Sequence, residues 1–211
     1  IVKSFDTKAI HGGAHSNNQF GETALPIYQS SAFAYDSAED IEAVFEGRKF
    51  GHIYSRISNP SVSGLEQKLT VLENGLGGLA LASGMAAISA IVFALAKSGD
   101  KILVSTSLFG GTYNYFREVI EPNNIKITYS KPEDIASHDD ISSYRFIFIE
   151  AIGNPKCDVP NISDIAKKAK KHGVPLIVDN TLTTPYLLNA KSLGANIVVN
   201  AATKYIGTGG T

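Results

Sequence analysis

Apolar residues follow two different patterns along the chain, and these separate a loop-rich beginning from a regular remainder. Residues 1–60 contain HGG, ETALPIYQSSAF and GHIYSRISNPS, and one short helical pattern, SAEDIEAVFEG, at residues 37–47. Ser37 is in position to cap that helix, with Asp40 near the capping-box position. An irregular segment of this length usually wraps over the rest of its own chain or over a second subunit.

From residue 61 onward, helical spacing alternates with short apolar runs. The spacing predicts helices at residues 61–75, 83–99, 110–122, 163–173 and 185–194. The apolar runs predict strands at residues 77–82, 100–105, 124–130, 144–151, 174–180 and 195–204. We expect Ser83 and Ser163 to cap two of the helices. This alternation is typical of an α/β fold with a mostly parallel sheet flanked by helices, which binds ligands at the carboxyl ends of its strands.

The composition supports a folded domain and argues against several kinds of partner. The 211 residues are 44% hydrophobic and 18% charged, which allows a sizeable core. The net charge of -1, from 19 basic and 20 acidic residues, gives no reason to expect nucleic acid or an anionic membrane as a partner. Cys157 is the single cysteine, so no intrachain disulfide can form. With no leader pattern and no apolar run of about 20 residues, we expect a cytoplasmic protein.

Candidate chemistry falls at the expected strand ends, which a parallel fold would bring to one edge. The run LALA leads into Ser83–Gly84–Met85–Ala86 and then a helix. Free backbone N–H groups and the helix dipole would suit a phosphate there. A strand–Ser–Gly–helix turn is also an ordinary helix cap, so this feature alone leaves both interpretations open.

Asp179 and Lys204 are the other two features at strand ends. Asp179 follows PLIV and is either a turn aspartate or the partner of a protonated pyridine nitrogen. Lys204 follows an apolar strand, and its ammonium either reaches water or is bound to an aldehyde as a Schiff base. The covalent link would remove the cost of burying an unpaired charge. Together these three features match the groups that hold pyridoxal 5'-phosphate (PLP).

Two other motifs point away from metal and nucleotide sites. His11 and His15 are four residues apart, but two glycines separate them and no third ligand is near, so we expect a loop and no metal site. NGLGG at residues 74–78 precedes its expected strand, whereas a dinucleotide fingerprint follows one. A Rossmann-like nucleotide site is therefore not expected.

Six motifs occur in the order typical of one enzyme family: YSRISNPS, LASGMAA, LFGGTYNYF, EAIGNPK, VDNT and ATKY. From about His11 onward, the chain resembles the PLP-dependent enzymes of cysteine and methionine metabolism. That family includes cystathionine γ-synthase, cystathionine lyases, methionine γ-lyase and O-acetylhomoserine sulfhydrylase. GGTYNYF, IGNPKCDVPNI and ISNPSVSGLEQKLTVLENG most resemble the sulfhydrylase (homocysteine synthase) branch. The resemblance implies the fold type I, or aspartate-aminotransferase-like, class of PLP-dependent transferases.

The resemblance also implies a domain organisation. Residues 1–60 would form a loop-rich arm that contacts a neighbouring subunit, and residues 61–211 an incomplete large PLP-binding α/β domain. Family members continue well beyond the lysine. The C-terminal domain, with the arginine that binds the substrate carboxylate, is therefore expected to be absent from this chain.

The resemblance assigns roles to residues on both sides of the cofactor. Lys204 would hold the cofactor aldehyde and move protons between substrate carbons, and Asp179 would keep the pyridine nitrogen protonated. The phosphate would receive backbone N–H groups from Gly84 and Met85 and a hydroxyl from Thr203.

Four more residues receive roles by the same resemblance. Tyr54 and Arg56 would reach the phosphate of the neighbouring subunit, where a guanidinium can donate two parallel hydrogen bonds. Phe109 would stack on the cofactor ring at the catalytic centre, and Asn154 would lie near the ring hydroxyl.

Two positions depart from the family pattern. Many members have tyrosine where this chain has Phe109, which can stack but has no hydroxyl. Many members have serine where this chain has Ala201, which would remove one phosphate hydrogen bond worth roughly 1–3 kcal/mol.

The implied reaction is a γ-replacement in methionine biosynthesis. O-acetyl-L-homoserine and sulfide, or another thiol donor, would give L-homocysteine and acetate. The enzyme would be a homo-oligomer, with active sites shared within a dimer and a tetramer as the expected assembly. Alternatives are a methionine γ-lyase, a cystathionine γ-synthase or γ-lyase, and a non-catalytic α/β scaffold that binds a phosphate ligand.

Overall fold

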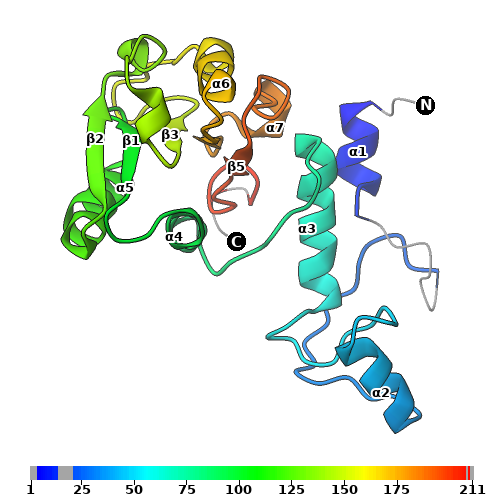
Figure 1. Ribbon diagram of the computed structural model, residues 1–211. Coiled ribbons are helices and arrows are strands. Elements are labelled where there is room, and N and C mark those ends of the chain that lie inside the picture. The colour runs from blue at the N-terminus through cyan, green and yellow to red at the C-terminus, as the bar shows by residue number, and fades with distance from the viewer. Residues whose placement is uncertain (1–3, 14–20, 208, 210–211) are drawn as a thin grey trace. The chain divides into compact units, whose positions relative to one another are not determined.

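The computed structural model describes residues 4–13, 21–207 and 209, which form two compact units, residues 1–80 and 81–211 (Figure 1). The expected boundary lay at residue 60, whereas the first unit also includes the helix that follows. His15 lies outside the described residues. The proposed arm on a neighbouring subunit stays a prediction.

Among the described residues of the first unit, three helices are regular: α1 (Phe5–His11), α2 (Ala38–Phe45) and α3 (Pro60–Glu73). The predicted cap of α2 is confirmed, because the Ser37 hydroxyl accepts a hydrogen bond from the backbone N–H of Asp40 at 3.1 Å. Helix α1 was not expected. It begins at a Ser4 cap and lies beside α3, where Lys8 Nζ donates to Asn74 Oδ1 at 3.1 Å. His11 therefore ends a helix and does not lie in the expected loop.

The second unit alternates strands and helices. Its helices are α4 (Gly84–Leu95), α5 (Gly110–Tyr115), α6 (Ile162–Lys171) and α7 (Thr184–Leu187). Shorter turns are the π-helix η1 (Phe116–Ile120) and the 3-10 helices η2 (Glu121–Asn123), η3 (Pro132–Asp134) and η4 (Ile141–Ser143). Its strands are β1 (Lys101–Ser105), β2 (Lys126–Ser130), β3 (Ile147–Glu150), β4 (Leu176–Asp179) and β5 (Ile197–Val199).

The five strands form one parallel sheet in the order β2-β1-β3-β4-β5, as the alternation predicted. Because the strands are parallel, all their carboxyl ends lie at one edge. The register aligns Glu150 with Asp179, and Asp179 with Val199, across β3, β4 and β5. These residues therefore end three neighbouring strands side by side.

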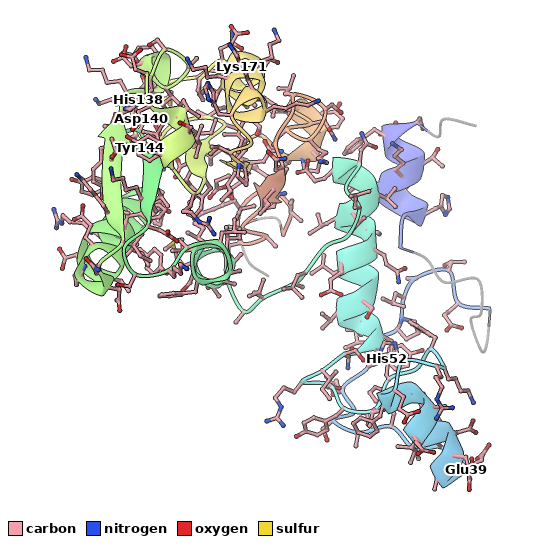
Figure 2. All side chains as sticks on the ribbon, in the orientation of Figure 1. Glu39, His52, His138, Asp140, Tyr144 and Lys171 are labelled. Carbon is pink, nitrogen blue, oxygen red and sulfur yellow. The ribbon has the colours of Figure 1, made fainter. Side chains whose placement is uncertain are left out.

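Successive residues of each strand point to opposite faces, and both faces are buried. In β3, Ile147 and Ile149 pack into the core beneath α6, whereas Phe148 packs into the core beneath α4 and η1. The loop between β2 and β3 helps to close the α6 face. There the rings of His138 and Tyr144 meet edge to face, with centroids 5.4 Å apart (Figure 2).

Several element boundaries differ from the predictions. Residues 77–82 do not form the expected strand: a strand needs a neighbour to complete its backbone hydrogen bonds, and no described residue pairs with this run. Helix α4 begins at the predicted Ser83 cap but stops at Leu95, because Asp100 accepts from the N–H of Lys97 and closes a turn into β1.

Two further helices also depart from expectation. Helix α6 is capped by Asn161, whose side chain accepts from the N–H of Asp164, and Ser163 lies inside the first turn. The helix expected at residues 110–122 changes from α to π to 3-10 winding. Among the described residues, no helix has the length and apolar character needed to span a bilayer.

Candidate active site

Two carboxylates end neighbouring strands at the ligand-binding edge of the second unit. Glu150 and Asp179 are register partners on β3 and β4. Phe148 and Ile177, two residues before each of them, pack into the core beneath α4 and η1. Because strand residues alternate between faces, both carboxylates point to the α4 side of the sheet.

Asp179 is a half-buried acid with a local hydrogen bond. Its Oδ1 accepts from the backbone N–H of Thr181 at 3.0 Å. Burial raises the pKa of the Asp179 carboxyl above its ordinary value, although the hydrogen bonds from Thr181 act in the opposite direction. Since burial penalises its charged form, this carboxylate would gain from a cation bound beside it.

Glu150 is more deeply buried than Asp179. It was not among the site residues predicted from the sequence. Its Oε1 accepts from the backbone N–H of Phe109 at 2.7 Å, and it receives a second backbone hydrogen bond from Asn154. Burial raises the pKa of Glu150 to about 7, with a further upward contribution from the charge of Asp179. The signal in the sequence was the same as for Asp179, an acid directly after an apolar run.

The start of α4 lies against the segment that follows β5. The Ser83 hydroxyl accepts a hydrogen bond from the N–H of Ala86 at 3.0 Å, and the Ser83 carbonyl accepts one from the N–H of Ala87. The N–H groups of Gly84 and Met85, at the first two positions, have no intrahelical acceptor. A Cβ added to Gly84 would lie 2.7 Å from the Cβ of Ala201, so glycine is required for this close approach.

The lysine-bearing segment is tied to the end of β4. Thr181, which follows Asp179 closely, accepts a hydrogen bond from the N–H of Ala201 through its Oγ1 at 2.8 Å. The N–H of Lys204 then donates to the carbonyl of Ala201 at 3.2 Å. Thr203 and Lys204 are exposed in the resulting turns. Thr181 was also missed in the sequence, because its role depends on the pairing of β4 with β5.

Phe109 and Asn154 lie on the loops after β1 and β3. Phe109 directly precedes α5, and its ring is 51% exposed, which leaves one side of an aromatic surface uncovered. A Cβ added to Gly111 would lie 2.5 Å from that ring. Asn154 is half-buried in the loop that the backbone bond to Glu150 holds in place.

Tyr54 and Arg56 belong to the first unit. Tyr54 pairs with Ala32 in an isolated antiparallel bridge. The Arg56 guanidinium lies over the Tyr54 ring, 5.4 Å from its centroid, and the Arg56 side chain is exposed. The two residues therefore form a local cation–π pair that presents a positive charge to solvent.

The groups of the second unit fit the chemistry of PLP. The cofactor carries a phosphate, an aldehyde and a ring nitrogen that can be protonated. Two N–H groups without intrahelical acceptors, at Gly84 and Met85, suit the phosphate. The half-buried carboxyl of Asp179 suits the cationic nitrogen, and Lys204 lies on a segment hydrogen-bonded to Thr181, just after β4.

Comparison with known sequences identifies a family. Residues 6–211 match the model of the family described as Cys/Met metabolism PLP-dependent enzyme. L-methionine gamma-lyase of Pseudomonas putida is 38% identical over 207 residues, covering 97% of this chain and 52% of that protein. O-acetyl-L-homoserine sulfhydrylase of Leptospira meyeri is 37% identical over 211 residues, covering 98% of this chain and 47% of that protein. The chain spans about half the length of these relatives.

Solved structures share the fold. A Campylobacter jejuni structure assigned as an O-acetylhomoserine (thiol)-lyase gives a TM-score of 0.90 at 32% identity, covers 99% of this chain and 52% of that one, and contains N'-pyridoxyl-lysine-5'-monophosphate. The structure of cystathionine gamma-lyase from Lactobacillus plantarum, complexed with L-serine, gives a TM-score of 0.86 at 31% identity. The match covers 97% of this chain and 52% of that one. These matches confirm the predicted fold type I and the PLP cofactor. The chain belongs to the Cys/Met metabolism family of PLP-dependent enzymes.

Proposed function

We propose that the full-length protein is an O-acetylhomoserine sulfhydrylase, which replaces the γ-acetoxy group of O-acetyl-L-homoserine with sulfide and releases L-homocysteine and acetate. The observation that carries the proposal is the convergence of Asp179, the start of α4 and the Lys204 segment at one edge of the sheet. The choice of reaction is supported by relatives of this name at 37% and 38% identity.

In this proposal, the protein residues anchor the cofactor at three points. Lys204 binds the aldehyde carbon covalently, and Asp179 holds the proton on the ring nitrogen. Gly84 and Met85 donate their backbone N–H groups to the phosphate, and Thr203 adds its hydroxyl. The bound cofactor supplies an electron sink that stabilises negative charge next to the substrate nitrogen.

The remaining residues orient the reactants and move protons. Once the substrate amine has displaced it, Lys204 removes the proton from the substrate Cα and then from Cβ, which allows acetate to leave from Cγ. After sulfide adds at Cγ, Lys204 returns one proton to Cβ and one to Cα, which completes L-homocysteine. Phe109 covers one face of the ring, and Asn154 lies beside its hydroxyl.

We further propose that Tyr54 and Arg56 act on the neighbouring subunit of a dimer. A solvent-facing guanidinium already ordered over an aromatic ring suits a phosphate brought by a partner. Mixing full-length Arg56→Ala and Lys204→Ala subunits tests this sharing. A mixed dimer would combine both defects in one site and leave the other intact, so activity should reappear. If mixed dimers form and remain as inactive as either parent, the sharing is refuted.

The reaction itself is tested by products. Full-length protein with PLP should release homocysteine and acetate from O-acetyl-L-homoserine plus sulfide, faster than it degrades methionine or cystathionine alone. Methionine γ-lyase is the second candidate, because a relative of that name is 38% identical. Faster release of methanethiol from methionine would establish that candidate and overturn the sulfhydrylase.

Lys204 is tested by spectroscopy. Lys204→Ala should lose the visible absorbance of the lysine-bound cofactor together with activity, whereas Lys191→Ala, outside the proposed site, should keep both. If Lys204→Ala keeps the absorbance and the activity, its assignment is wrong.

A further inference from the structure

Two loops that carry proposed cofactor contacts meet at one buried side chain. The loop after β1 carries Phe109, and the loop after β3 carries Asn154. Glu150, the last residue of β3, accepts backbone hydrogen bonds from both residues. One carboxyl group therefore joins two segments that are about forty residues apart in sequence.

The burial of Glu150 makes this connection firm. The residue is 7% exposed, and the Phe109 N–H approaches its Oε1 at 2.7 Å. A buried polar group that loses its hydrogen-bond partner is disfavoured, so both the carboxyl and the Phe109 amide favour keeping the bond. Rotation of Glu150 away from the loops would leave both groups unsatisfied.

A second set of hydrogen bonds joins the same two loops. The Ser107 hydroxyl donates to Asp158 Oδ2 at 2.5 Å, and the Gly153 N–H donates to the Asp158 carbonyl at 2.8 Å. A Cβ on Gly153 would lie 2.6 Å from the Cβ of Ser107, so the loops are in close contact there. The two loops are therefore joined at two places, at Glu150 and at Asp158.

We propose that Glu150 is a positioning residue that holds the Phe109 ring and the Asn154 loop in the arrangement that receives the cofactor. The proposal rests on the proposed roles of Phe109 and Asn154 at the cofactor. Glu150 itself makes no contact with substrate in this account. It acts by fixing the backbone from which the Phe109 ring projects.

The test uses full-length protein and three variants. Glu150→Ala removes the acceptor, and Glu150→Gln keeps a carbonyl oxygen of similar reach but no charge. Glu118→Gln is the matched control, because Glu118 is an exposed glutamate that pairs with Arg117. Three quantities are measured: hydrogen exchange of the peptide containing the Phe109 amide, the PLP dissociation constant, and the visible circular dichroism of the bound cofactor.

Glu150→Ala should speed exchange at Phe109 and weaken PLP binding about tenfold, as expected for the loss of one charged hydrogen bond. Glu150→Gln should show an intermediate effect, Glu118→Gln should match the wild type, and the dichroism should change only in the Glu150 variants. If Glu150→Ala does not fold, Glu150→Gln alone decides. Wild-type exchange, dichroism and PLP affinity in a folded Glu150 variant would overturn the proposal.

These readouts do not depend on the reaction catalysed. A wild-type protein that binds PLP but forms no homocysteine would refute the sulfhydrylase and leave the ordering of the variants intact. Equal binding and exchange in all variants, with normal homocysteine formation, would instead refute the role of Glu150.

Discussion

Gly84 and Ala201 meet where helix α4 begins and the chain leaves β5, with a Cβ added to Gly84 falling 2.7 Å from the Cβ of Ala201. The two residues are far apart in sequence, and their contact joins the proposed phosphate cradle to the segment that carries Lys204. An alanine methyl group fills this space. The closeness makes the contact sensitive to single methyl groups.

Gly84→Ala should therefore weaken PLP binding. Real Cβ atoms hardly ever approach to 2.7 Å, so either α4 or the Ala201 segment must move. We expect the PLP affinity of full-length protein to fall about tenfold, for an overpacking cost of 1–3 kcal/mol. Fluorescence titration with PLP measures the change.

The control for this prediction is the compensating double variant. Gly84→Ala combined with Ala201→Gly removes the conflicting methyl group and should recover most of the affinity. An unchanged affinity in Gly84→Ala alone would show that the contact can relax freely.

Thr181→Val should loosen the lysine-bearing segment. The variant keeps the size of the side chain but removes the Oγ1 that accepts from the Ala201 N–H at 2.8 Å. Leaving that amide without its acceptor should cost about 1 kcal/mol of unfolding free energy, measured by chemical denaturation. Thr128→Val on the edge strand β2 serves as the control. Equal losses in both variants would contradict a special role for Thr181.

Gly111→Ala should displace the Phe109 ring. The added Cβ would lie 2.5 Å from a ring carbon of Phe109, and the ring can escape only by rotating. We expect altered visible circular dichroism of the bound cofactor and lower kcat, with a smaller change in global stability. Gly110→Ala is the neighbouring control, because its added Cβ would meet nothing within 4 Å beyond its chain neighbours and its own helix backbone. The prediction fails if the two variants behave alike.

Glu150 should make stability depend on pH. Burial raises the pKa of this carboxyl from its ordinary value of 4.5 to about 7. Between these values the folded protein binds more protons than the unfolded chain, so its stability falls as the pH rises. The full difference corresponds to about 3 kcal/mol.

Chemical denaturation of cofactor-free, full-length protein between pH 5 and pH 8 checks this direction. Glu150→Gln has no titrating group there, so its stability should change less with pH than that of the wild type. Asp179, whose pKa is also raised, is present in both proteins and largely cancels in the comparison. If the unfolding free energies of the wild type and Glu150→Gln change equally with pH, the raised pKa of Glu150 is contradicted.

The sheet was predictable because its strands are apolar runs buried on both faces. Leu176–Asp179 and Lys101–Ser105 fall within their expected ranges. The run at residues 77–82 is also apolar but contains no β-branched residue, and it pairs with none of the described strands. Helix α1 was missed because seven residues give too little periodicity.

Some residues of the candidate site could be predicted from the sequence, and others could not. Asp179 and Lys204 stood out because each interrupts or ends an apolar run. Glu150 also ends an apolar run, but the sequence does not show that Phe109 and Asn154 are its hydrogen-bond partners. No sequence pattern indicated Thr181, because its role as a hydrogen-bond acceptor arises from the pairing of β4 with β5.

Strand β5 is at one edge of the sheet and is the last of the five strands in the sequence. Translation therefore completes the helix start at Gly84 and the acid at Asp179 before it reaches the amine of Lys204. A nascent chain shorter than this lacks the lysine that the proposal assigns to the cofactor aldehyde. Under the proposed role of Lys204, the residues of all five described strands are synthesised before the cofactor can be captured covalently at this lysine.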